Sequence, residues 1–593
     1  MSKWDMSNFP PSNHSLWKEN ALKELKPKQL DSLQWHYDPD VIIQPYYEKT
    51  DAFFSLAGNA NAELLPDQQM GRLWHYLDSI TIDTQVADNK DANEIALESL
   101  GQGADGILWK LKEIDQSAHV TLFKDIAFEY CQNAFQVYQW GEAEEAFFQR
   151  FFSGSFLKKD ILPGFLFYDP VSDSDEILRI EALFPQGKSF RPHCFDATSE
   201  LTSSLSPTGQ IAYLLLAFIE RCKKLSSAGV SIDSIVDRTI VCVSIGRDFF
   251  HEMAKIKAIK VVLSQAANHF DGSKVSPADI KIYSQPNVNT HSVVDPYVNL
   301  IRMTSAAMAG VNGGASYLSM PGFDSRNPFS LGQFSRRISR NISNLLRDES
   351  YFDKNCDPMA GSYFLEKLSE ELASEGWTKM QKIESSGGFS SSLAGGYWQN
   401  EANKFQEKER ALIASRKLNV VGVNNFCDLS LFESFPTLKR YNGDGSLLSS
   451  FERLRIKMEG YLAKQSGQSR PAAMAVFFGD KQASLARYNF VKGVLPAAGI
   501  DVAEWVPWSP QHSAPFSADT RLIIACSSDQ DYIESGPSVF QALKEQCPDA
   551  HIVLAGNPAD NKEQLTKAGI DSFIHLKSDF VKTLSSYQKL FGI

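Results

Sequence analysis

The last fifth of the chain alternates short apolar runs with amphipathic stretches. Uninterrupted apolar runs of this length are typical of strands buried on both faces of a parallel sheet. They occupy residues 472–478, 500–506, 521–526, 551–555 and 572–576. Helical periodicity marks residues 481–498, 532–546, 561–568 and 579–590. Strands that alternate with helices in this way predict one doubly wound domain over residues 471–593, with any ligand beyond the carboxyl ends of the strands.

A second alternation of apolar runs and amphipathic helices extends from about residue 74 to residue 396. Its candidate strands are residues 106–111, 120–123, 163–168, 191–195, 239–245, 280–284 and 315–319. Seven or eight βα units over roughly 320 residues fit a closed (β/α)8 TIM barrel better than an open sheet. The predicted fold class is therefore α/β, with a barrel at 52–400, a helical linker region at 401–470 and a flavodoxin-like doubly wound domain at 471–593.

Residues 1–51 have a different composition from the rest of the chain. They are rich in Pro, Asn, Trp and Tyr and contain one short helical stretch, so they cannot bury a core of their own. This pattern predicts an extended N-terminal arm. Its aromatic side chains either pack on their own barrel or wrap around a partner, since Trp and Tyr give large contact areas at interfaces.

The predicted helix at residues 331–347 has two distinct faces. Apolar side chains recur every three or four residues at Leu331, Phe334, Ile338, Ile342 and Leu345. Four arginines fall on the other side, at Arg336, Arg337, Arg340 and Arg347. We expect the apolar stripe to face the barrel and the arginines to face solvent, with an interface or a phosphate contact as the alternative.

Charge and cysteine usage narrow the class of protein. The net charge of −12 argues against nonspecific nucleic-acid binding, which needs a basic surface. The eight cysteines are scattered singly, as expected for reduced thiols in a cytosol. Without a secretory pattern or an apolar run of 18 residues, we expect no membrane association and a bacterial cytoplasmic location.

Short motifs that suggest chemistry do not hold up. The run G-Q-G-A-D-G at 101–106 follows a predicted helix and precedes a strand, the reverse of a dinucleotide-binding turn. His251-Glu252 begins like a zinc-protease helix, but Lys255 stands where the second ligand belongs. Neither a catalytic triad nor a metal-ligand cluster stands out. The pattern alone predicts an architecture without a reaction.

An ordered set of motifs in the distal half of the predicted barrel resembles the methylmalonyl-CoA mutase family. The motifs are R-M-T-S-A-A-M-A-G-V-N-G-G at 302–314, Phe323-Asp324, Ser335-Arg336, Arg340-Asn341, D-P-M-A-G-S-Y at 357–363 and I-E-S-S-G-G-F at 383–389. The resemblance implies a barrel that threads the pantetheine chain of an acyl-CoA and a sheet domain that presents adenosylcobalamin. In such an enzyme the cofactor carries the radical chemistry and the protein orients and shields it.

The sheet domain departs from that family where cobalamin would bind. The family's loop is D-x-H-x-x-G, in which the histidine ligates cobalt, and the matching positions here are Gln482, Ser484 and Arg487. The family's contacts to the nucleotide tail are only partly kept, at Ser527-Ser528-Asp529 and Ala555-Gly556. We therefore expect no cofactor-binding and no metal-binding residue on this chain.

The barrel departs from the family in the same way. The family's Tyr-His active-site pair falls at Ser199-Glu200, and its later Asn and Glu fall at Pro321 and Ser325. The family's R-P-W-T-I-R-Q-Y stretch has no counterpart between residues 51 and 111. We therefore expect no catalytic residue in this barrel.

Together these departures resemble the small (beta) subunit of heterodimeric bacterial methylmalonyl-CoA mutases. The resemblance implies a non-catalytic partner of a large (alpha) subunit, which holds adenosylcobalamin, handles the acyl-CoA and interconverts methylmalonyl-CoA and succinyl-CoA in propanoate metabolism. Two alternatives stay open. One is an autonomous acyl-CoA mutase with unconventional site residues, and the other is a cobalamin or acyl-CoA sensor or a mutase assembly factor.

Overall fold

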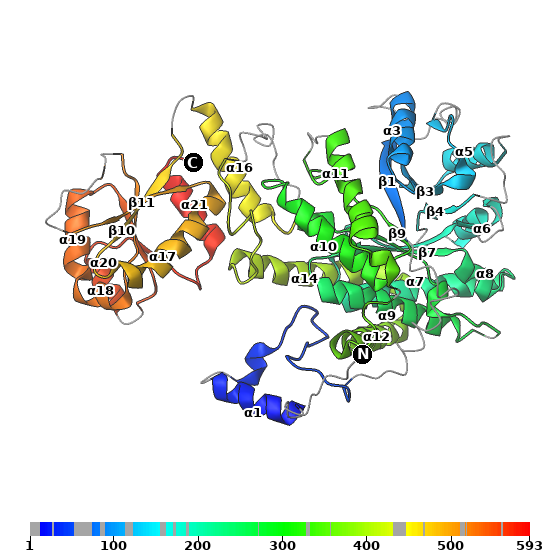
Figure 1. Ribbon diagram of the computed structural model, residues 1–593, viewed down its shortest axis with the longest axis horizontal. Helices are drawn as coiled ribbons and strands as arrows, with labels where there is room; N and C mark the ends of the chain where they lie inside the picture. The colour runs from blue at the N-terminus through cyan, green and yellow to red at the C-terminus, as the bar shows by residue number, and fades with distance from the viewer. Residues whose placement is uncertain are drawn as a thin grey trace, which may run out of the picture. The chain divides into compact units, whose positions relative to one another are not determined.

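The computed structural model, shown in Figure 1, places most of the chain. It describes residues 12–25, 29–51, 74–82, 89–112, 122–153, 162–169, 174–184, 189–270, 272–327, 332–355, 357–430, 446–465, 469–509, 516, 519–558 and 561–593. The chain divides into two compact units. The first comprises Met1–Asn287, Arg302–Gly322 and Gly332–Phe405, and the second comprises Val288–Ile301, Phe323–Leu331 and Gln406–Ile593.

The first unit is built around a nearly closed parallel barrel. Its strands are β1 (His75–Ile82), β2 (Gly106–Leu111), β3 (Gln132–Val137), β4 (Gly164–Phe167), β5 (Phe190–Arg191), β6 (His193–Ala197), β7 (Thr239–Ile245), β8 (Ile282–Pro286) and β9 (Tyr317–Leu318). The hydrogen-bonded order is β5-β4-β3-β2-β1-β9-β8-β7-β6, with every pair parallel. The TIM-type barrel predicted from the sequence is confirmed.

Pro192 explains why nine strands make an eight-membered barrel. Phe190–Arg191 pairs with β4, whereas His193–Ala197 pairs with β7. Proline has no N–H to donate to a strand ladder, so the pairing breaks between the two segments. β5 and β6 are thus two halves of one strand, and they bring the two ends of the sheet together.

Two strands of the barrel are not predicted by the apolar pattern, and one predicted strand is not a strand in the structure. β1 and β3 were not among the candidate strands, because buried polar residues such as Asp78 and Asn133 interrupt their apolar runs. The strand predicted at residues 120–123 is wrong in its described half, where Leu122 and Phe123 lie in a helical turn. Residues 120 and 121 lie outside the described residues.

Helices connect and surround the strands. In chain order they are α3 (Asn89–Gly101), α5 (Glu142–Ser153), α6 (Ser174–Leu183), α7 (Pro207–Ser227), α8 (Ile232–Asp237), α9 (Phe249–Ala267), α10 (Val298–Gly313), α11 (Gln333–Asn344), α12 (Tyr363–Ser385), α13 (Gly388–Ala394) and α14 (Tyr397–Ala414). α7, α9 and α12 pack together, and Leu215, Ile259 and Leu368 belong to one continuous buried core.

Helix α11 and the π-helical turn after it (Leu345–Glu349) follow the expected pattern only in part. Ile342 is buried and Arg337 is exposed, as predicted, but two other arginines are not turned to solvent. Arg340 is 3% exposed and its guanidinium lies 2.9 Å from the Asp78 carboxylate on β1. Arg347 pairs with Asp105 at 2.8 Å and lies over the Trp74 ring. Phe334 and Leu345 are exposed instead. The expectation that these two arginines face solvent was wrong, because each finds a carboxylate far away in the sequence.

The segment that precedes the barrel packs on the first unit's own helices. Asp38 accepts hydrogen bonds from the Thr208 backbone N–H and hydroxyl at 2.8 and 3.0 Å. These contacts place a carboxylate at the N-terminal end of α7, where the helix dipole favours negative charge. The Trp35 indole N–H donates to Asp248, the residue that caps α9. The short helix α1 (His14–Glu24) has no buried residue.

The second unit contains a five-stranded parallel sheet covered on both faces (Figure 1). Its strands are β10 (Ala472–Phe477), β11 (Asp501–Pro507), β12 (Leu522–Ala525), β13 (His551–Ala555) and β14 (Ser572–Ile574), in the order β11-β10-β12-β13-β14. Its helices are α16 (Ser449–Lys464), α17 (Lys481–Val494), α18 (Asp529–Glu534), α19 (Gly536–Gln546), α20 (Lys562–Lys567) and α21 (Phe580–Leu590). All five strands confirm runs predicted from the sequence.

Neighbouring residues of each strand serve opposite faces of this sheet, as the two-residue period requires. On β12, Ile524 joins a core with α16, α17 and α21, whereas Ile523 joins a core with α18, α19 and α20. α16 is tied to this layer by buried polar contacts. Gln588 of α21 donates to the Leu454 and Ala498 carbonyls at 2.7 and 2.9 Å.

Candidate functional site

Helix α17 starts shortly after β10. It contains Gln482, Ser484 and Arg487, the three positions that the resemblance matches to the family's D-x-H-x-x-G loop. Asp480 caps the helix by accepting the Gln482 and Ala483 N–H groups at 2.6 and 2.9 Å. Gln482 is exposed in the first turn. Ser484 is fully buried, and its hydroxyl donates to the Asp480 carbonyl at 2.7 Å. The hydroxyl has no exposed surface, so it is out of reach of an external metal.

Arg487, one turn further along α17, crosses the carboxyl edge of the sheet. Its guanidinium donates to the Ser527 carbonyl, lies 2.6 Å from an Asp529 carboxylate oxygen and sits 4.8 Å above the centre of the Tyr532 ring. This combination of an ion pair, a carbonyl and an aromatic face holds the planar group in place. The edge where the family presents cobalamin is therefore covered by a side chain of this chain.

The remaining degenerate positions support that arrangement. The Ser527 hydroxyl accepts the Phe478 N–H at 2.9 Å, and Ser528 caps α18. Ala555 is buried at the end of β13. Gly556 has φ +155°, and a Cβ there would approach the Arg487 guanidinium carbon to 3.4 Å. The structure thus brings these residues together around Arg487, whereas Gln482 stays apart in the first turn of α17.

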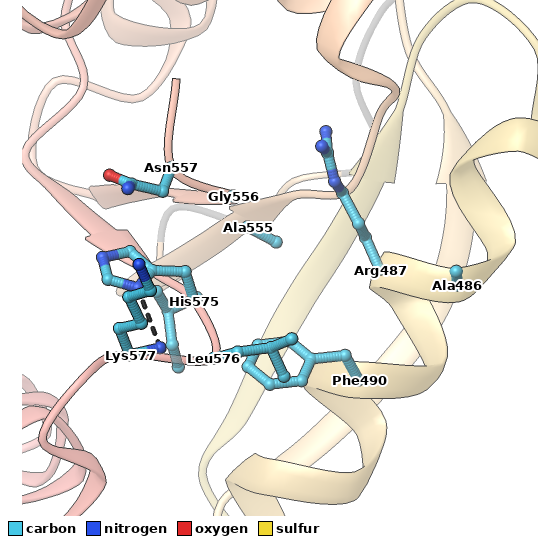
Figure 2. Close-up of a pocket in the computed structure, with 10 residues that line it drawn as sticks. Ala486, Arg487, Phe490, Ala555, Gly556, Asn557, His575, Leu576 and Lys577 are labelled. Carbon is cyan, nitrogen blue, oxygen red and sulfur yellow. Dashed lines mark hydrogen bonds between the residues drawn. The ribbon is translucent and has the colours of Figure 1, made fainter. Parts of the chain in front are cut away.

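A cavity of about 430 Å³ opens beside this cluster, between α17 and the ends of β13 and β14. It is lined by Ala486, Arg487, Phe490, Ala555, Gly556, Asn557, Ile574, His575, Leu576 and Lys577. Figure 2 shows Arg487 and Phe490 leaving α17 in different directions. Of these residues, Arg487, Ala555 and Gly556 could be singled out from the sequence. The residues at the end of β14 could not, because no motif marks them.

The degenerate barrel positions have local structural roles. Ser199 and Glu200 are exposed in the turn after β6. The Ser199 hydroxyl lies 2.8 Å from the Thr202 hydroxyl, and the Glu200 carbonyl accepts from Ser204 at 2.6 Å. After β9, Pro321 is partly buried and Ser325 is exposed. None of these four residues presents a charged or nucleophilic group within a described cavity.

One acid near the end of β6 has an unusual pKa. Burial raises the pKa of Asp196 to about 6, although hydrogen bonds from Thr198 oppose the shift. The Thr198 N–H and hydroxyl both donate to one Asp196 carboxylate oxygen at 2.6 Å. Perturbed carboxyls of this kind are common at active sites. Here the acid is engaged by its own turn, so its geometry indicates a structural role.

The axis of the barrel is filled by side chains. Every hydrogen-bonded strand except the short β5 contributes to one buried cluster, whose members are Leu77, Leu108, Ala134, Phe165, Phe167, Cys194, Ile240, Cys242, Tyr283 and Tyr317. Phe165 contacts Tyr283 and Tyr317 with ring centres 5.6 and 5.1 Å apart. All ten residues are at most 5% exposed. The four aromatic residues of this cluster lie in strands that the sequence predicts, but no sequence pattern marks them as facing the barrel axis.

The described part of the chain was also compared with the requirements of a metal centre and of a membrane-spanning helix. No group of three or more His, Cys, Asp or Glu side chains is arranged to hold a metal ion there. Among the helices that the structure describes, none combines the length and apolar character needed to cross a membrane.

Comparison with known proteins finds similarity to methylmalonyl-CoA mutases. The sequence model described as methylmalonyl-CoA mutase matches residues 204–443. The chain is 26% identical over 626 residues to the methylmalonyl-CoA mutase small subunit of Porphyromonas gingivalis, which covers 99% of this chain and 98% of that protein. The chain is thus similar to methylmalonyl-CoA mutases over residues 204–443 and to a small subunit over nearly its whole length.

Within the methylmalonyl-CoA mutase family, the similarity extends furthest along small subunits. The probable small subunit of Mycobacterium tuberculosis is 25% identical over 422 residues, covering 69% of this chain and 64% of that protein. The methylmalonyl-CoA mutase of Escherichia coli is 30% identical over 220 residues, covering only 37% of this chain and 30% of that protein. The chain is thus similar over a greater part of its length to small subunits than to the Escherichia coli mutase.

The residues at the sheet edge do not fit the cobalamin that the family resemblance implies. The position of the metal ligand carries a buried, internally bonded hydroxyl. The glycine of the family's loop is replaced by Arg487, whose side chain is held at this edge by three separate contacts. Cobalt prefers an imidazole nitrogen to a serine hydroxyl as its protein ligand. The described edge therefore offers no imidazole at the position of Ser484, and the Arg487 side chain lies across it.

Proposed function

We propose that this chain is the non-catalytic small (beta) subunit of an adenosylcobalamin-dependent methylmalonyl-CoA mutase. It would support a large (alpha) subunit that holds the cofactor, handles the acyl-CoA and interconverts methylmalonyl-CoA and succinyl-CoA. In this proposal the second unit is a flavodoxin-like, cobalamin-type domain that no longer binds cobalamin. The degenerate positions in both units are structural residues.

The single observation that carries the proposal is the filled barrel axis. A pantetheine chain threaded through a barrel needs an open path along the axis. Here Phe165, Phe167, Tyr283 and Tyr317 occupy that path and are at most 5% exposed. Protein interiors are close-packed, so admitting a ligand would require displacing these rings at a large energetic cost. A barrel of this kind stabilises a subunit and leaves the acyl-CoA to the partner.

The N-terminal arm supplies a candidate surface for that partner. Leu16 and Leu22 of α1 are 40% and 46% exposed. The rings of His14, Trp17 and Tyr46 stack nearly parallel, with centres 5.2 to 6.1 Å apart. Aromatic and apolar side chains on a helix with no buried residue are typical of subunit interfaces. This surface supports a permanent contact with the large subunit.

Co-expression with a large subunit tests the proposal. We expect the two chains to purify as a stable one-to-one complex with mutase activity that depends on adenosylcobalamin. The isolated chain should show neither activity nor the absorbance of bound cobalamin after gel filtration. Activity of the isolated chain would establish the autonomous mutase instead. A complex that forms only transiently would favour an assembly factor.

A further inference from the structure

A second cavity lies in the first unit, between the N-terminal arm and helix α12. Its volume of about 350 Å³ falls within the range of small-molecule sites. The lining residues come from α1, from residues 30–51 and from the N-terminal half of α12. Leu16 and Leu22, the exposed apolar positions of α1, do not line it. The cavity is therefore distinct from those two contact positions.

Aromatic rings form one wall of this cavity. Trp17 and Tyr46 stack with ring centres 5.2 Å apart and planes inclined by 18°. Tyr47 contacts Phe364 of α12, with ring centres 5.5 Å apart, which ties the arm to that helix. Trp17, Tyr46 and Tyr47 are all partly buried. Because the face of an aromatic ring is electron-rich, this wall attracts an ammonium or guanidinium group and packs against an apolar chain.

Three carboxylates also line the cavity, at Asp31, Asp51 and Glu371. One Asp51 oxygen accepts the Glu48 N–H at 2.8 Å, and the carboxylate keeps lone pairs for a further donor. The pKa of the Tyr47 phenol is raised, chiefly by burial and also by the charges of Glu371 and Asp51. Two of the three carboxylates therefore act on one hydroxyl group of the aromatic wall.

The two lysines of the lining do not neutralise these acids. Lys367 lies 3.2 Å from Glu370, which is outside the lining, and 3.9 Å from Glu371. Burial raises the pKa of the Glu371 carboxyl, Lys367 opposes the shift, and two neighbouring glutamates add to it. Lys18 is exposed to solvent. With Lys367 shared between two glutamates, a ligand in the cavity meets more negative than positive charge.

We propose that this cavity binds a small organic cation, a short alkyl chain that carries a primary ammonium or a guanidinium group. The charged group donates hydrogen bonds to the Asp51 and Glu371 carboxylates, and the chain lies against the aromatic wall. Every wall of the cavity comes from this chain, so the site does not depend on the proposed subunit function. Ammonium and guanidinium compounds share this chemistry, and binding measurements separate the two.

Calorimetric titration of the purified full-length chain tests the site with four probes. Butylamine presents an ammonium group and butylguanidine a guanidinium group, whereas 1-butanol is uncharged and butyrate is an anion. About 150 mM NaCl in the buffer screens the nonspecific attraction of cations to a chain whose net charge is −12. We expect at least one of the two cations to bind, 1-butanol to bind about tenfold more weakly, and butyrate not to bind.

Four variants assign the binding to this cavity. Glu371→Gln removes one carboxylate charge and should weaken cation binding by about fivefold or more. Trp17→Leu stays apolar but removes an aromatic face, which should weaken binding by about two- to fivefold. Lys18→Gln removes a competing positive charge and should strengthen binding by about twofold. Glu349→Gln, at an exposed position outside the lining, is the matched control and should leave binding unchanged.

Several results would overturn the proposal. Failure of both cations to bind at about 10 mM would exclude a site of useful affinity, because that concentration exceeds the weakest metabolite affinities by roughly tenfold. Equal binding of 1-butanol would show that the cavity does not recognise charge. Equal weakening by Glu349→Gln and Glu371→Gln would indicate nonspecific attraction.

The probe series on the parent chain decides the proposal even where a variant fails to fold, and circular dichroism identifies such a variant. Weaker cation binding by Lys18→Gln would contradict the assigned sign of the site. None of these outcomes bears on whether the chain forms a complex with a large subunit.

Discussion

Ser484 contributes to the packing of helix α17, at the position that the family resemblance matches to a cobalt-ligating histidine. Its hydroxyl satisfies the Asp480 carbonyl, and its side chain has no exposed surface. A histidine at this position would have to fit an imidazole into space that holds a hydroxymethyl group. Ser484 is therefore part of the packing of helix α17.

Ser484→His should destabilise the chain without creating a cobalamin site. Overpacking a buried position costs about 1–3 kcal/mol, and the imidazole would also lose the hydrogen bond to Asp480. We expect a lower urea midpoint and no bound-cobalamin absorbance. Ser484→Ala, which leaves the packing unchanged, should alter the free energy of unfolding by less than about 1.5 kcal/mol. Tight cobalamin uptake by the histidine variant would contradict the assignment.

Asp196 links stability to pH through its raised pKa. Folding raises the pKa of this carboxyl from its ordinary 3.8 to about 6, chiefly through burial. The folded state therefore holds the proton more tightly than the unfolded state does. The resulting stabilisation is fully present below about pH 4 and is lost as pH rises through about 6.

Asp196→Asn removes this pH dependence. Asparagine keeps an oxygen that can accept from Thr198 but carries no charge at any pH. Relative to the parent chain, the variant should gain on the order of 2–3 kcal/mol between pH 4 and pH 7. Urea unfolding at both pH values measures the gain. Asp549→Asn, at an exposed position, should differ from the parent by nearly the same small amount at both.

At the scale of whole elements, apolar pattern predicted strands well where both faces of the strand are apolar. All five strands of the second unit and six of the eight barrel positions could be predicted in this way. β1 and β3 could not, because Asp78 and Asn133 are buried and satisfied by distant or local partners. Asp78 meets Arg340 across 262 residues of sequence, and a pairing of that range leaves no local signal.

The same limit applies to the candidate sites. The departures at 482, 484 and 487 could be read by position, since the family's motif has fixed spacing. The contacts that the Arg487 side chain makes could not be predicted, because Ser527, Asp529 and Tyr532 lie outside helix α17 and no local pattern links them to it. The filled barrel axis also required the structure, since strand patterns do not reveal which face points inward.

Truncating the barrel axis should weaken the fold and open no catalytic path. Tyr283 is fully buried and contacts both Phe165 and Phe167. Tyr283→Ala should cost about 3–5 kcal/mol, as expected for removing a large buried ring. Tyr130→Ala removes the same atoms from a residue that is 85% exposed, so its urea midpoint should hardly change. Equal stability of the two variants would contradict a packed axis.

Helix α1 should matter for assembly and little for the fold. Leu16→Glu with Leu22→Glu places charges on its exposed apolar positions, and no residue of α1 is buried in the isolated chain. We expect the thermal midpoint of the isolated chain to stay unchanged while affinity for the large subunit falls about tenfold or more. Asn20→Glu, on an exposed polar position of the same helix, is the matched control. Surface plasmon resonance on the intact chains measures both affinities.

Considered as a whole molecule, the chain places its own side chains both along the barrel axis and across the sheet edge. Aromatic rings occupy the barrel axis, and Arg487 covers the sheet edge. The sequence similarity to the Porphyromonas gingivalis small subunit nevertheless extends over 99% of this chain, whereas the similarity to the Escherichia coli methylmalonyl-CoA mutase covers 37% of it. A protein of this kind is expected to respond to its partner and not to the cofactor.

Thermal unfolding distinguishes these two responses. A ligand that binds only the folded state stabilises it by RT ln(1 + [L]/Kd), which is about 2.7 kcal/mol at a hundredfold excess over Kd. A saturating large subunit should therefore raise the midpoint of this chain by several degrees. Adenosylcobalamin alone should leave the midpoint within experimental error, because the Ser484 hydroxyl is buried and Arg487 lies across the sheet edge. The large subunit tested with the same cofactor provides the positive control. A cofactor-induced rise in this chain's midpoint would show that Arg487 yields to the corrin and that the chain is no silent partner.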